Sequence, residues 1–392
     1  MTREHVKKAN HVNKMRMVVT PAEAGAPLSL SPERIGLDSR LRGNDRPKRT
    51  AYTPLPAYPT LRSLFSAVLA AITVTVLLAS SSNAQSDANG GQGGAFYQVP
   101  LGARATALGG AYRSIADDGS GPLYNPAGVC SIRKSLFGTS YRAMRLDRTH
   151  GYLTGLVPIR DEAVIGGTYL YSSSGKVAGR DSDGYPTGLD FSFTNHDIGI
   201  IFAKRFENYF AMGARLSYVY ARFAEMSAAT VNVDFGTMLY VNQLMGREEG
   251  ALFPVQDIQI GLVFKHLDTK YKWNNEQYVL KHVSAYDIGS DQIDNVPMEV
   301  GFGASGRFLA SKLLVAADIA KSQKQSVIAA LGAEYLISPQ LALRAGFGDK
   351  RLTAGSGYLF NIGGRKLAID YAFSTDKVDE GSEHMFSIDV QF

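Results

Sequence analysis

From about residue 134 to its last residue, the chain repeats one pattern, in which apolar side chains alternate with small or polar ones. The runs are roughly 9–14 residues long and turn signals separate them, whereas helical spacing is nearly absent. In the last run the two sides of the strand are cleanly divided, with Phe386, Ile388, Val390 and Phe392 on one and Ser387, Asp389 and Gln391 on the other. Strands of about this length and period are typical of outer-membrane β-barrels.

The pattern predicts about fourteen strands, and their connections alternate in length. Tight links such as Glu207-Asn208 and Ser338-Pro339 contrast with long polar stretches at 173–190, 242–254 and 268–294. Short periplasmic turns and long outer loops are the asymmetry expected of a barrel. The predicted strands are 135–144, 151–159, 163–172, 191–205, 209–223, 230–241, 255–267, 295–308, 313–321, 327–337, 341–348, 357–363, 366–374 and 384–392.

Alternation alone also suits a soluble β-sandwich, so other features decide between the two classes. The strand charges fall on the less apolar face, as a polar lumen requires; they are Arg215, Asp234, Asp318, Asp370 and Asp389. The terminal Phe392 closes an alternating strand and resembles the signal that the outer-membrane assembly machinery reads. We therefore predict an all-β protein of the bacterial outer membrane, with an antiparallel transmembrane barrel over residues 133–392.

The basic character of the chain belongs to its leader. Residues 1–84 hold 12 of the 41 Lys and Arg and 5 of the 36 Asp and Glu, which leaves 29 basic and 31 acidic residues in the remainder. The rest of the chain thus gives no reason to expect a nucleic-acid partner.

Residues 61–84 have the order of a secretory signal peptide. Arg62 precedes the apolar run 64–79, and Ser82-Asn83-Ala84 offers small residues at a cleavage site. The alternative is a single membrane anchor, for which the run is slightly short. Residues 1–60 are basic and aperiodic, and we interpret them as a non-native or disordered leader that arises from a mis-called start.

Residues 85–132 differ from the strands in texture, being rich in glycine and alanine. They contain one short helical pattern at 103–116 and end in the turn Tyr124-Asn125-Pro126-Ala127-Gly128. The segment is too long for a linker and too irregular for a strand, so we predict a plug, or hatch, inside the barrel lumen.

The order Leu-Gly-Ala-Arg-Ala-x-x-Leu-Gly-Gly-Ala-Tyr, then Ala-Asp-Asp, then Tyr-Asn-Pro-Ala-Gly, resembles the opening of PorV/PorQ family outer-membrane proteins. It is more distantly similar to the FadL-like long-chain fatty-acid transporters, whose hatch carries an Asn-Pro-Ala motif. The resemblance covers about residues 93–132, and Cys130 departs from the apolar residue expected there. It implies plug or ligand-binding roles for Asn125, Pro126, Ala127, Gly128, Arg104, Asp117 and Asp118, of which bracing the plug by turn hydrogen bonds is the simpler.

The resemblance implies a component of protein secretion of the type IX kind, which would bind exported cargo C-terminal domains or translocon partners. A partner site would then be built from the outer loops, including Tyr271 and Trp273. The alternatives are a FadL-like carrier of hydrophobic small molecules and a purely structural barrel. Membrane lipid and the barrel assembly machinery are expected partners in every case.

Motifs that carry enzymatic chemistry do not occur in the sequence. There is no Gly-x-Gly-x-x-Gly or Walker motif and no Gly-x-Ser-x-Gly, and the seven histidines are scattered without metal spacing. Cys130 has no second cysteine to pair with, and Asp117-Asp118 alone supplies too few oxygens for calcium. We therefore expect no enzymatic activity, no cofactor and no metal.

Overall fold

The computed structural model describes residues 93–181, 183–245, 255–274, 293–375 and 381–392. All of them belong to one compact unit, Tyr58–Phe392. The leader, the signal peptide and residues 85–92, for which the sequence made predictions, lie outside the described residues.

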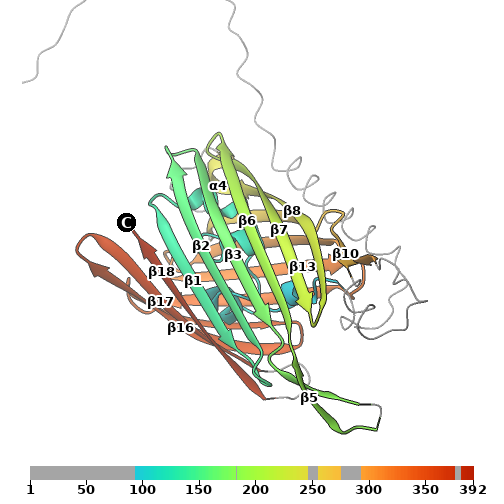
Figure 1. Ribbon diagram of the computed structural model, residues 1–392. Helices are drawn as coiled ribbons and strands as arrows, with labels where there is room; N and C mark the ends of the chain where they lie inside the picture. Colours follow the sequence, from blue (N-terminus) through green and yellow to red (C-terminus); the bar gives the residue numbers. More distant parts are fainter. Residues whose placement is uncertain (1–92, 182, 246–254, 275–292, 376–380) are drawn as a thin grey trace, which may run out of the picture. The chain divides into compact units, whose positions relative to one another are not determined.

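Fourteen antiparallel strands form a closed barrel, which confirms the predicted fold class (Figure 1). Around the wall they follow the order β8-β7-β6-β3-β2-β1-β18-β17-β16-β15-β14-β13-β12-β9, and β9 pairs with β8 to close the ring. Their bounds are β1 Leu136–Ala143, β2 Thr149–Ile159, β3 Ala163–Ser173, β6 Phe193–Phe206, β7 Phe210–Phe223, β8 Met226–Tyr240, β9 Gln256–Lys265, β12 Glu299–Phe308, β13 Leu313–Ser322, β14 Ile328–Leu336, β15 Leu341–Gly348, β16 Arg351–Ile362, β17 Arg365–Thr375 and β18 Ser382–Gln391.

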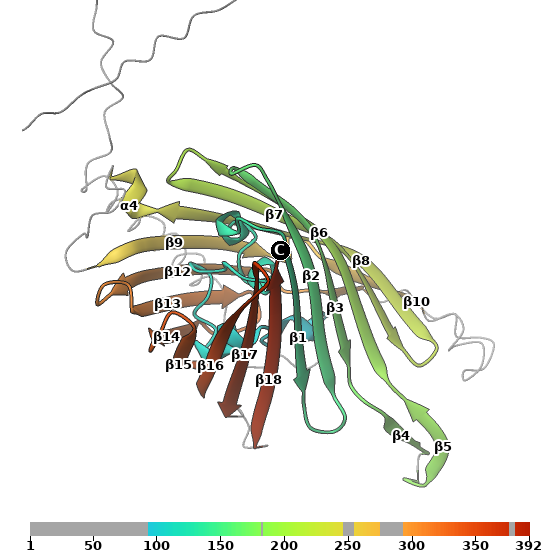
Figure 2. The same cartoon turned by 90° about the vertical axis from the view of Figure 1, so that its left-hand side faces the viewer.

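Four further strands lie in stretches that the sequence assigned to loops. β4 (Val177–Arg180) and β5 (Pro186–Phe191) form a separate hairpin that projects past the ends of the wall strands (Figure 2). β10 (Lys270–Asn274) pairs with β8, and β11 (Ile293–Asn295) pairs with β10. These strands are short and carry many exposed polar residues, so alternation does not reveal them.

The alternation sorts side chains between lipid and lumen. On β6 and β7, Phe202 and Leu216 point outward and are about half exposed, at 50% and 47%, while Arg215 between them faces inward at 1%. Because an outward charge at the bilayer midplane costs about 2–4 kcal/mol, charges in the middle of a strand favour the inner face, whereas Lys204 near the end of β6 lies on the same outward face as Phe202. Of the other charges predicted to face inward, Asp234, Asp318 and Asp370 are buried and Asp389 is partly buried.

The two ends of the barrel differ in their connections. Short turns at 160–162, 207–209, 309–312, 337–340 and 363–364 share one end with the C-terminal end of β18. The hairpin of β4 and β5 and the connection after β10 lie at the other. The second end also holds the two-residue turns 224–225 and 349–350. Because the β4–β5 hairpin projects past the wall strands there, we take the second end as the outer one and the first as periplasmic. The predicted outer loop at 242–254 is an exception, because α4 (Val241–Leu244) follows the periplasmic end of β8.

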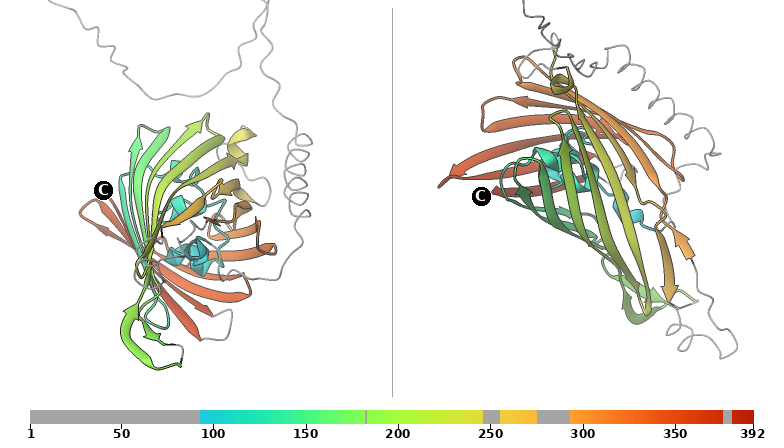
Figure 3. Two further views of the ribbon diagram at one scale, coloured as in Figure 1. Left: turned by 45° about the vertical axis from the view of Figure 1, so that its right-hand side comes forward. Right: turned by 90° about the horizontal axis from the view of Figure 1, so that it is seen from above.

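Residues 93–132, hereafter the plug, pack inside the barrel (Figure 3). They form η1 (Ala95–Gln98), α2 (Ala103–Ala107), α3 (Gly121–Tyr124) and η2 (Gly128–Ser131). The helix expected at 103–116 stops early because Gly109 and Gly110 adopt φ of 69° and 85°, which end the helical path. Within the described part of the chain, every helix is too short or too polar to cross a bilayer.

Candidate functional site

The Asn125–Gly128 turn seats the plug on the wall. The Asn125 side chain is fully buried and donates from Nδ2 to the carbonyls of Arg113 (2.7 Å) and Thr237 (3.1 Å). Its Oδ1 accepts from the amide of Ala127 at 3.0 Å, which closes an Asx turn. On the wall opposite it, a Cβ at Gly236 would lie 2.0 Å from Asn125 Oδ1, so only glycine allows this approach.

The rest of the predicted turn also contacts protein. Pro126 lies against Gly213 of β7, where a Cβ would approach the Pro126 carbonyl carbon to 2.5 Å. Gly128 packs on Ala116, and Ala127 is completely buried. The contacts of the turn are therefore those of a brace between plug and wall.

Arg104, Asp117 and Asp118 come together on the periplasmic side of the plug. Arg104 forms a bidentate pair with Glu334 of β14 (2.8 and 3.0 Å) and also contacts Asp117. Burial alone would lower the pKa of Arg104, but the Asp117 and Glu334 carboxylates outweigh it and hold the pKa above its ordinary value. Asp118 accepts hydrogen bonds from the amide and hydroxyl of Ser120 (2.9 and 2.7 Å).

The Arg104 pair continues into the wall as a chain of alternating charges. Glu334 also binds Arg344 of β15 at 2.6 Å, and Arg344 in turn pairs with Asp370 of β17. Together with Asp389, these residues line a cavity of about 250 Å³. The cavity thus combines apolar side chains with charged ones, of which Arg104, Glu334, Arg344 and Asp370 are paired with one another.

Arg113 makes a second charged anchor on the same half of the wall. Its side chain pairs with Glu299 of β12 (2.5 Å) and lies 3.4 Å from Asp318 of β13. Asp318 also accepts the backbone amides of Tyr112 and Arg113, both at 2.9 Å. The plug is therefore tied to β12, β13 and β14 by ion pairs.

The opposite half of the wall contains an interruption that sequence reasoning missed. β8 pairs with β9 from Phe235 to Tyr240 and with β10 from Ser227 to Ala229. Between these ladders, residues 230–234 of β8 lie opposite the longer stretch 265–271. The stretch 265–271 therefore has two more residues than the stretch it faces, which interrupts the backbone pairing. Because the excess is an even number, the same side chains still face the lumen on both sides of the gap.

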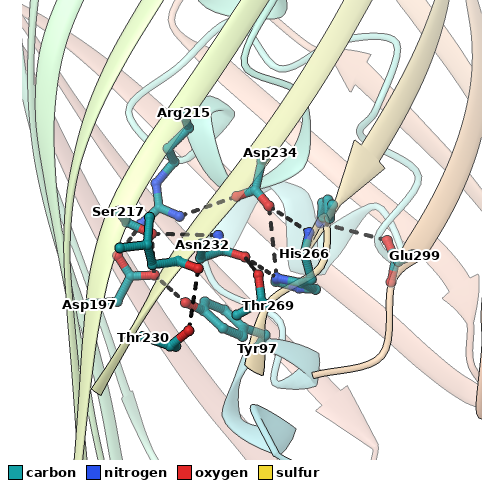
Figure 4. A network of polar contacts seen from close by, with 12 residues as sticks. Tyr97, Asp197, Arg215, Ser217, Thr230, Asn232, Asp234, His266, Thr269 and Glu299 are labelled. Atoms are coloured by element: carbon teal, nitrogen blue, oxygen red, sulfur yellow. Dashed lines mark hydrogen bonds and ion pairs between the residues drawn. The ribbon is translucent and has the colours of Figure 1, made fainter. Parts of the chain in front are cut away.

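Side chains replace the missing ladder at the interruption (Figure 4). Asp234 accepts the backbone amide of His266 at 3.0 Å, and Asn232 Oδ1 lies 2.8 Å from His266 Nδ1. Thr269 donates its hydroxyl to the same Asn232 oxygen at 3.0 Å. The interruption is thus held mainly by these side-chain contacts, together with one backbone hydrogen bond from the Leu267 amide to the Val233 carbonyl at 3.1 Å. Its signal in the sequence is the pair Lys265-His266 at the end of the predicted strand 255–267, followed by Asp268-Thr269 at the start of the predicted loop.

Behind the interruption, wall charges neutralise one another. Arg215 of β7 pairs with Asp197 of β6 and lies 3.3 Å from Asp234 of β8. Tyr97 of the plug donates its hydroxyl to Asp197 at 2.5 Å (Figure 4). Burial raises the pKa of Tyr97, so this hydroxyl keeps its proton and acts as the donor.

A cavity of about 150 Å³ adjoins this network on the outer side of the plug. Asp234, Lys265 and His266 of the interrupted wall line it. The remainder of its lining is mixed: aromatic and aliphatic residues of the plug and β3 face further charges, and it includes Tyr97, Leu101, Leu123, Tyr124, Leu170, Arg113, Arg215 and Glu299. The pocket is only partly apolar, because charged side chains share the lining with aromatic residues of the plug.

Tyr271 and Trp273 lie on β10, beside the interruption. Tyr271 is 2% exposed, and the Trp273 indole donates to Asp294 at 2.8 Å. Both side chains therefore pack on the barrel. At the other end of the wall, the amide of Phe392 donates to the Ser135 carbonyl at 2.9 Å, and the Phe392 ring is about half exposed beneath the Arg365 guanidinium. In the described part of the chain, no three His, Cys, Asp or Glu side chains gather as a metal site would require.

Comparisons with solved structures agree with this fold. The monoaromatic hydrocarbon channel CymD aligns with 75% of the chain and 98% of its own length, at 13% identity and a TM-score of 0.52. The Ralstonia pickettii toluene transporter TbuX aligns with 74% of the chain and 97% of its own length, at 13% identity and a TM-score of 0.50. No protein-family model and no curated protein sequence matches the chain.

At such low identity the likeness concerns the fold alone. The closed fourteen-strand barrel, its apolar outer face and these neighbours define a plugged β-barrel protein of the bacterial outer membrane. A Pseudomonas aeruginosa FadL homologue aligns with a TM-score of 0.48 and 11% identity, which is too low to carry an argument.

Proposed function

We propose that the protein is a channel that passes hydrophobic small molecules through the outer membrane, with the interruption between β8 and β9 as the exit from its outer cavity. The observation that carries this proposal is that Asp234, Lys265 and His266 belong both to the interrupted wall and to the cavity lining. A hydrophobic solute gains free energy by leaving sideways into lipid rather than into water. The solutes of CymD, a monoaromatic hydrocarbon channel, and of TbuX, a toluene transporter, belong to the same class.

The contacts across the proposed exit are few, so opening it would cost little free energy. Only polar contacts of Asn232 and Asp234 with 266–269 cross the gap, besides the backbone bond from Leu267 to the Val233 carbonyl at 3.1 Å. A ladder of the same length would hold more backbone hydrogen bonds, each with a net contribution of about 1 kcal/mol. Within the described wall, this stretch is therefore the one where two neighbouring strands separate most easily.

Deleting Asp268 and Thr269 tests the exit, because it leaves equal numbers of residues on the two sides of the gap. We expect the wall to close and uptake of toluene into vesicles with a lipopolysaccharide outer leaflet, which slows direct entry of the solute, to fall to the level of protein-free vesicles of the same composition. Deleting Asp183 and Gly184 at the exposed hairpin between β4 and β5 is the matched control and should leave uptake unchanged. Full uptake by the Asp268–Thr269 deletion, in a barrel shown to be folded, would contradict the proposal.

The secretion role stays a prediction that rests on the resemblance of residues 93–132 alone. It requires a cargo domain or translocon partner at the outer end of the barrel, where β10 and the β4–β5 hairpin lie. Gentle extraction followed by native mass spectrometry separates the two functions, because a retained protein subunit favours secretion and a retained hydrophobic adduct favours the channel.

A further inference from the structure

The lipid-facing surface carries a row of aromatic side chains near the outer end of the wall. The row follows the strand register, with Tyr141 opposite Phe386 on one side and Tyr171 opposite His196 on the other. Aromatic girdles of this kind sit at the membrane interface. The full row is Tyr371, Phe386, Tyr141, Gly151, Tyr171, His196 and Tyr220.

Gly151 is the one gap in this row. It pairs directly with Tyr141 of β1 and with Tyr171 of β3, so the missing side chain leaves a slot between two tyrosine rings. The slot belongs to an outward hollow of about 410 Å³, whose floor and sides also include Leu153 and Tyr169. Nothing fills it from the protein side, since a Cβ at Gly151 would meet its nearest atom, the Ser140 carbonyl oxygen, at 4.0 Å.

One side of the slot is held in place by hydrogen bonding. The Tyr169 hydroxyl lies 2.9 Å from His196 Nδ1, and the Tyr171 ring packs on the same imidazole at 5.2 Å between centroids. Tyr141 on the other side is 53% exposed and Leu153 is 41% exposed. The hollow is therefore a preformed apolar groove whose width suits a flexible hydrocarbon chain.

Cations surround the outer end of the same three strands. Arg145 and Arg148 lie in the turn that joins β1 to β2, and Lys176 follows the end of β3. Gly175 packs against Leu146 and Asp147 of that turn, so Lys176 is brought beside the two arginines. Among the described residues 145–148 and 176, three basic side chains accompany one acidic residue, Asp147, and they lie just beyond the aromatic row that marks the membrane interface.

We propose that this surface of β1, β2 and β3 (Figure 1) is a binding site for a phosphorylated lipid of the outer leaflet, with an acyl chain in the Gly151 groove and the phosphate on Arg145, Arg148 and Lys176. The apolar groove matches the acyl chain of such a lipid, and the basic residues at the same strand ends match its phosphate. The site faces the bilayer and is separate from the lumen, so it is independent of the proposed channel.

The test uses the barrel in phosphatidylcholine nanodiscs that contain a small fraction of lipid A, followed by native mass spectrometry of the released protein. Gly151→Phe fills the groove and should lower lipid A retention about tenfold, because the ring displaces at least two methylene groups from contact. Gly155→Phe places the same ring on the same face of β2, outside the hollow and with no atom within 4 Å of its Cβ, and should retain lipid A like the unaltered protein. Equal retention by the two variants would overturn the proposal.

A second experiment tests the part of the site that would bind the lipid headgroup. Replacing Arg145, Arg148 and Lys176 by glutamine should lower retention of lipid A but not of a phosphate-free glycolipid with the same chains. If the triple variant retains lipid A fully, the basic cluster plays no part and the proposal fails. Heat-dependent migration on gels reports barrel folding for each variant, and toluene uptake is expected to stay unchanged, which separates this site from the channel.

Discussion

The two halves of the barrel wall hold the plug in different ways. Along β12, β13 and β14, carboxylates of the wall pair with Arg104 and Arg113 of the plug. Along β6, β7 and β8, the wall charges Asp197, Arg215 and Asp234 pair with one another. The plug is thus bound electrostatically to the continuous half, whereas the interrupted half balances its own charge.

The difference assigns separate tasks to the two halves. Ion pairs inside the lumen are desolvated, so removing one partner is costly and the plug cannot leave that half of the wall without loss. On the other half the plug is joined by the Asn125 turn, the Tyr97 hydroxyl and a hydrogen bond of 3.4 Å from the Arg205 guanidinium to the Cys130 carbonyl, none of which is an ion pair between plug and wall. The interruption can therefore rearrange without breaking an ion pair between plug and wall.

The largest effect is expected for Arg104→Met. Glu334 is 4% exposed and would keep only Arg344 as a cationic partner, so the free energy of unfolding should fall by about 3 kcal/mol. Urea unfolding of the barrel in lipid vesicles measures it. Arg133→Met, which removes an exposed hydrogen bond to the Asp161 carbonyl, serves as the control and should cost no more than about 0.5 kcal/mol. Similar losses in the two variants would show that the plug is not bound through this pair.

The plug's uncharged contact with β8 is broken by Gly236→Ala. The new methyl group would lie 2.0 Å from Asn125 Oδ1, so the turn must shift at a cost of about 2 kcal/mol. Limited proteolysis should then cut the plug faster than in the unaltered protein. Gly155→Ala adds the same methyl group where no atom lies within 4 Å and should change nothing. An unchanged cleavage rate in Gly236→Ala would mean that the plug is not seated on β8.

A smaller effect is expected for Asp234→Asn. Arg215 keeps Asp197, and the amide oxygen can still accept from His266, so the cost should be about 1 kcal/mol. The change should appear as faster amide exchange over 265–269, with β12 to β14 unaffected. Asp257→Asn, at an exposed carboxylate near Arg307, is the control. Exchange that rises equally around the whole wall would argue against a local gate.

The smallest effect concerns Cys130 at the periplasmic end of the plug. Burial raises its pKa to about 11, and the side chain is 2% exposed. At pH 8 the thiolate is therefore about a thousandfold less populated than the thiol, and iodoacetamide should label it only after unfolding. The folded-state rate should increase with pH up to about 11. Rapid labelling at neutral pH would show that this part of the plug opens to water.

Much of the wall could be predicted from the sequence. All fourteen strands of the closed barrel were predicted, and the inward position of Arg215, Asp234 and Asp318 followed from the period of two. Both depend on local information, because a lipid-facing charge is costly wherever it occurs in a strand. The boundaries were less accurate. β16 begins at Arg351 rather than near 357, because the first residues of this strand include small side chains that do not alternate clearly with apolar ones.

The tertiary structure alone decided the features that bear on function. The interruption at 265–271 exists only relative to 230–234 of a strand some thirty residues earlier, and register between strands is not encoded in either strand by itself. The partners of Arg104 and Asn125 lie more than a hundred residues further along the chain, on Glu334 and Thr237. Alternation reports which face a residue occupies, whereas its partners depend on how the barrel closes and where the plug comes to rest inside it.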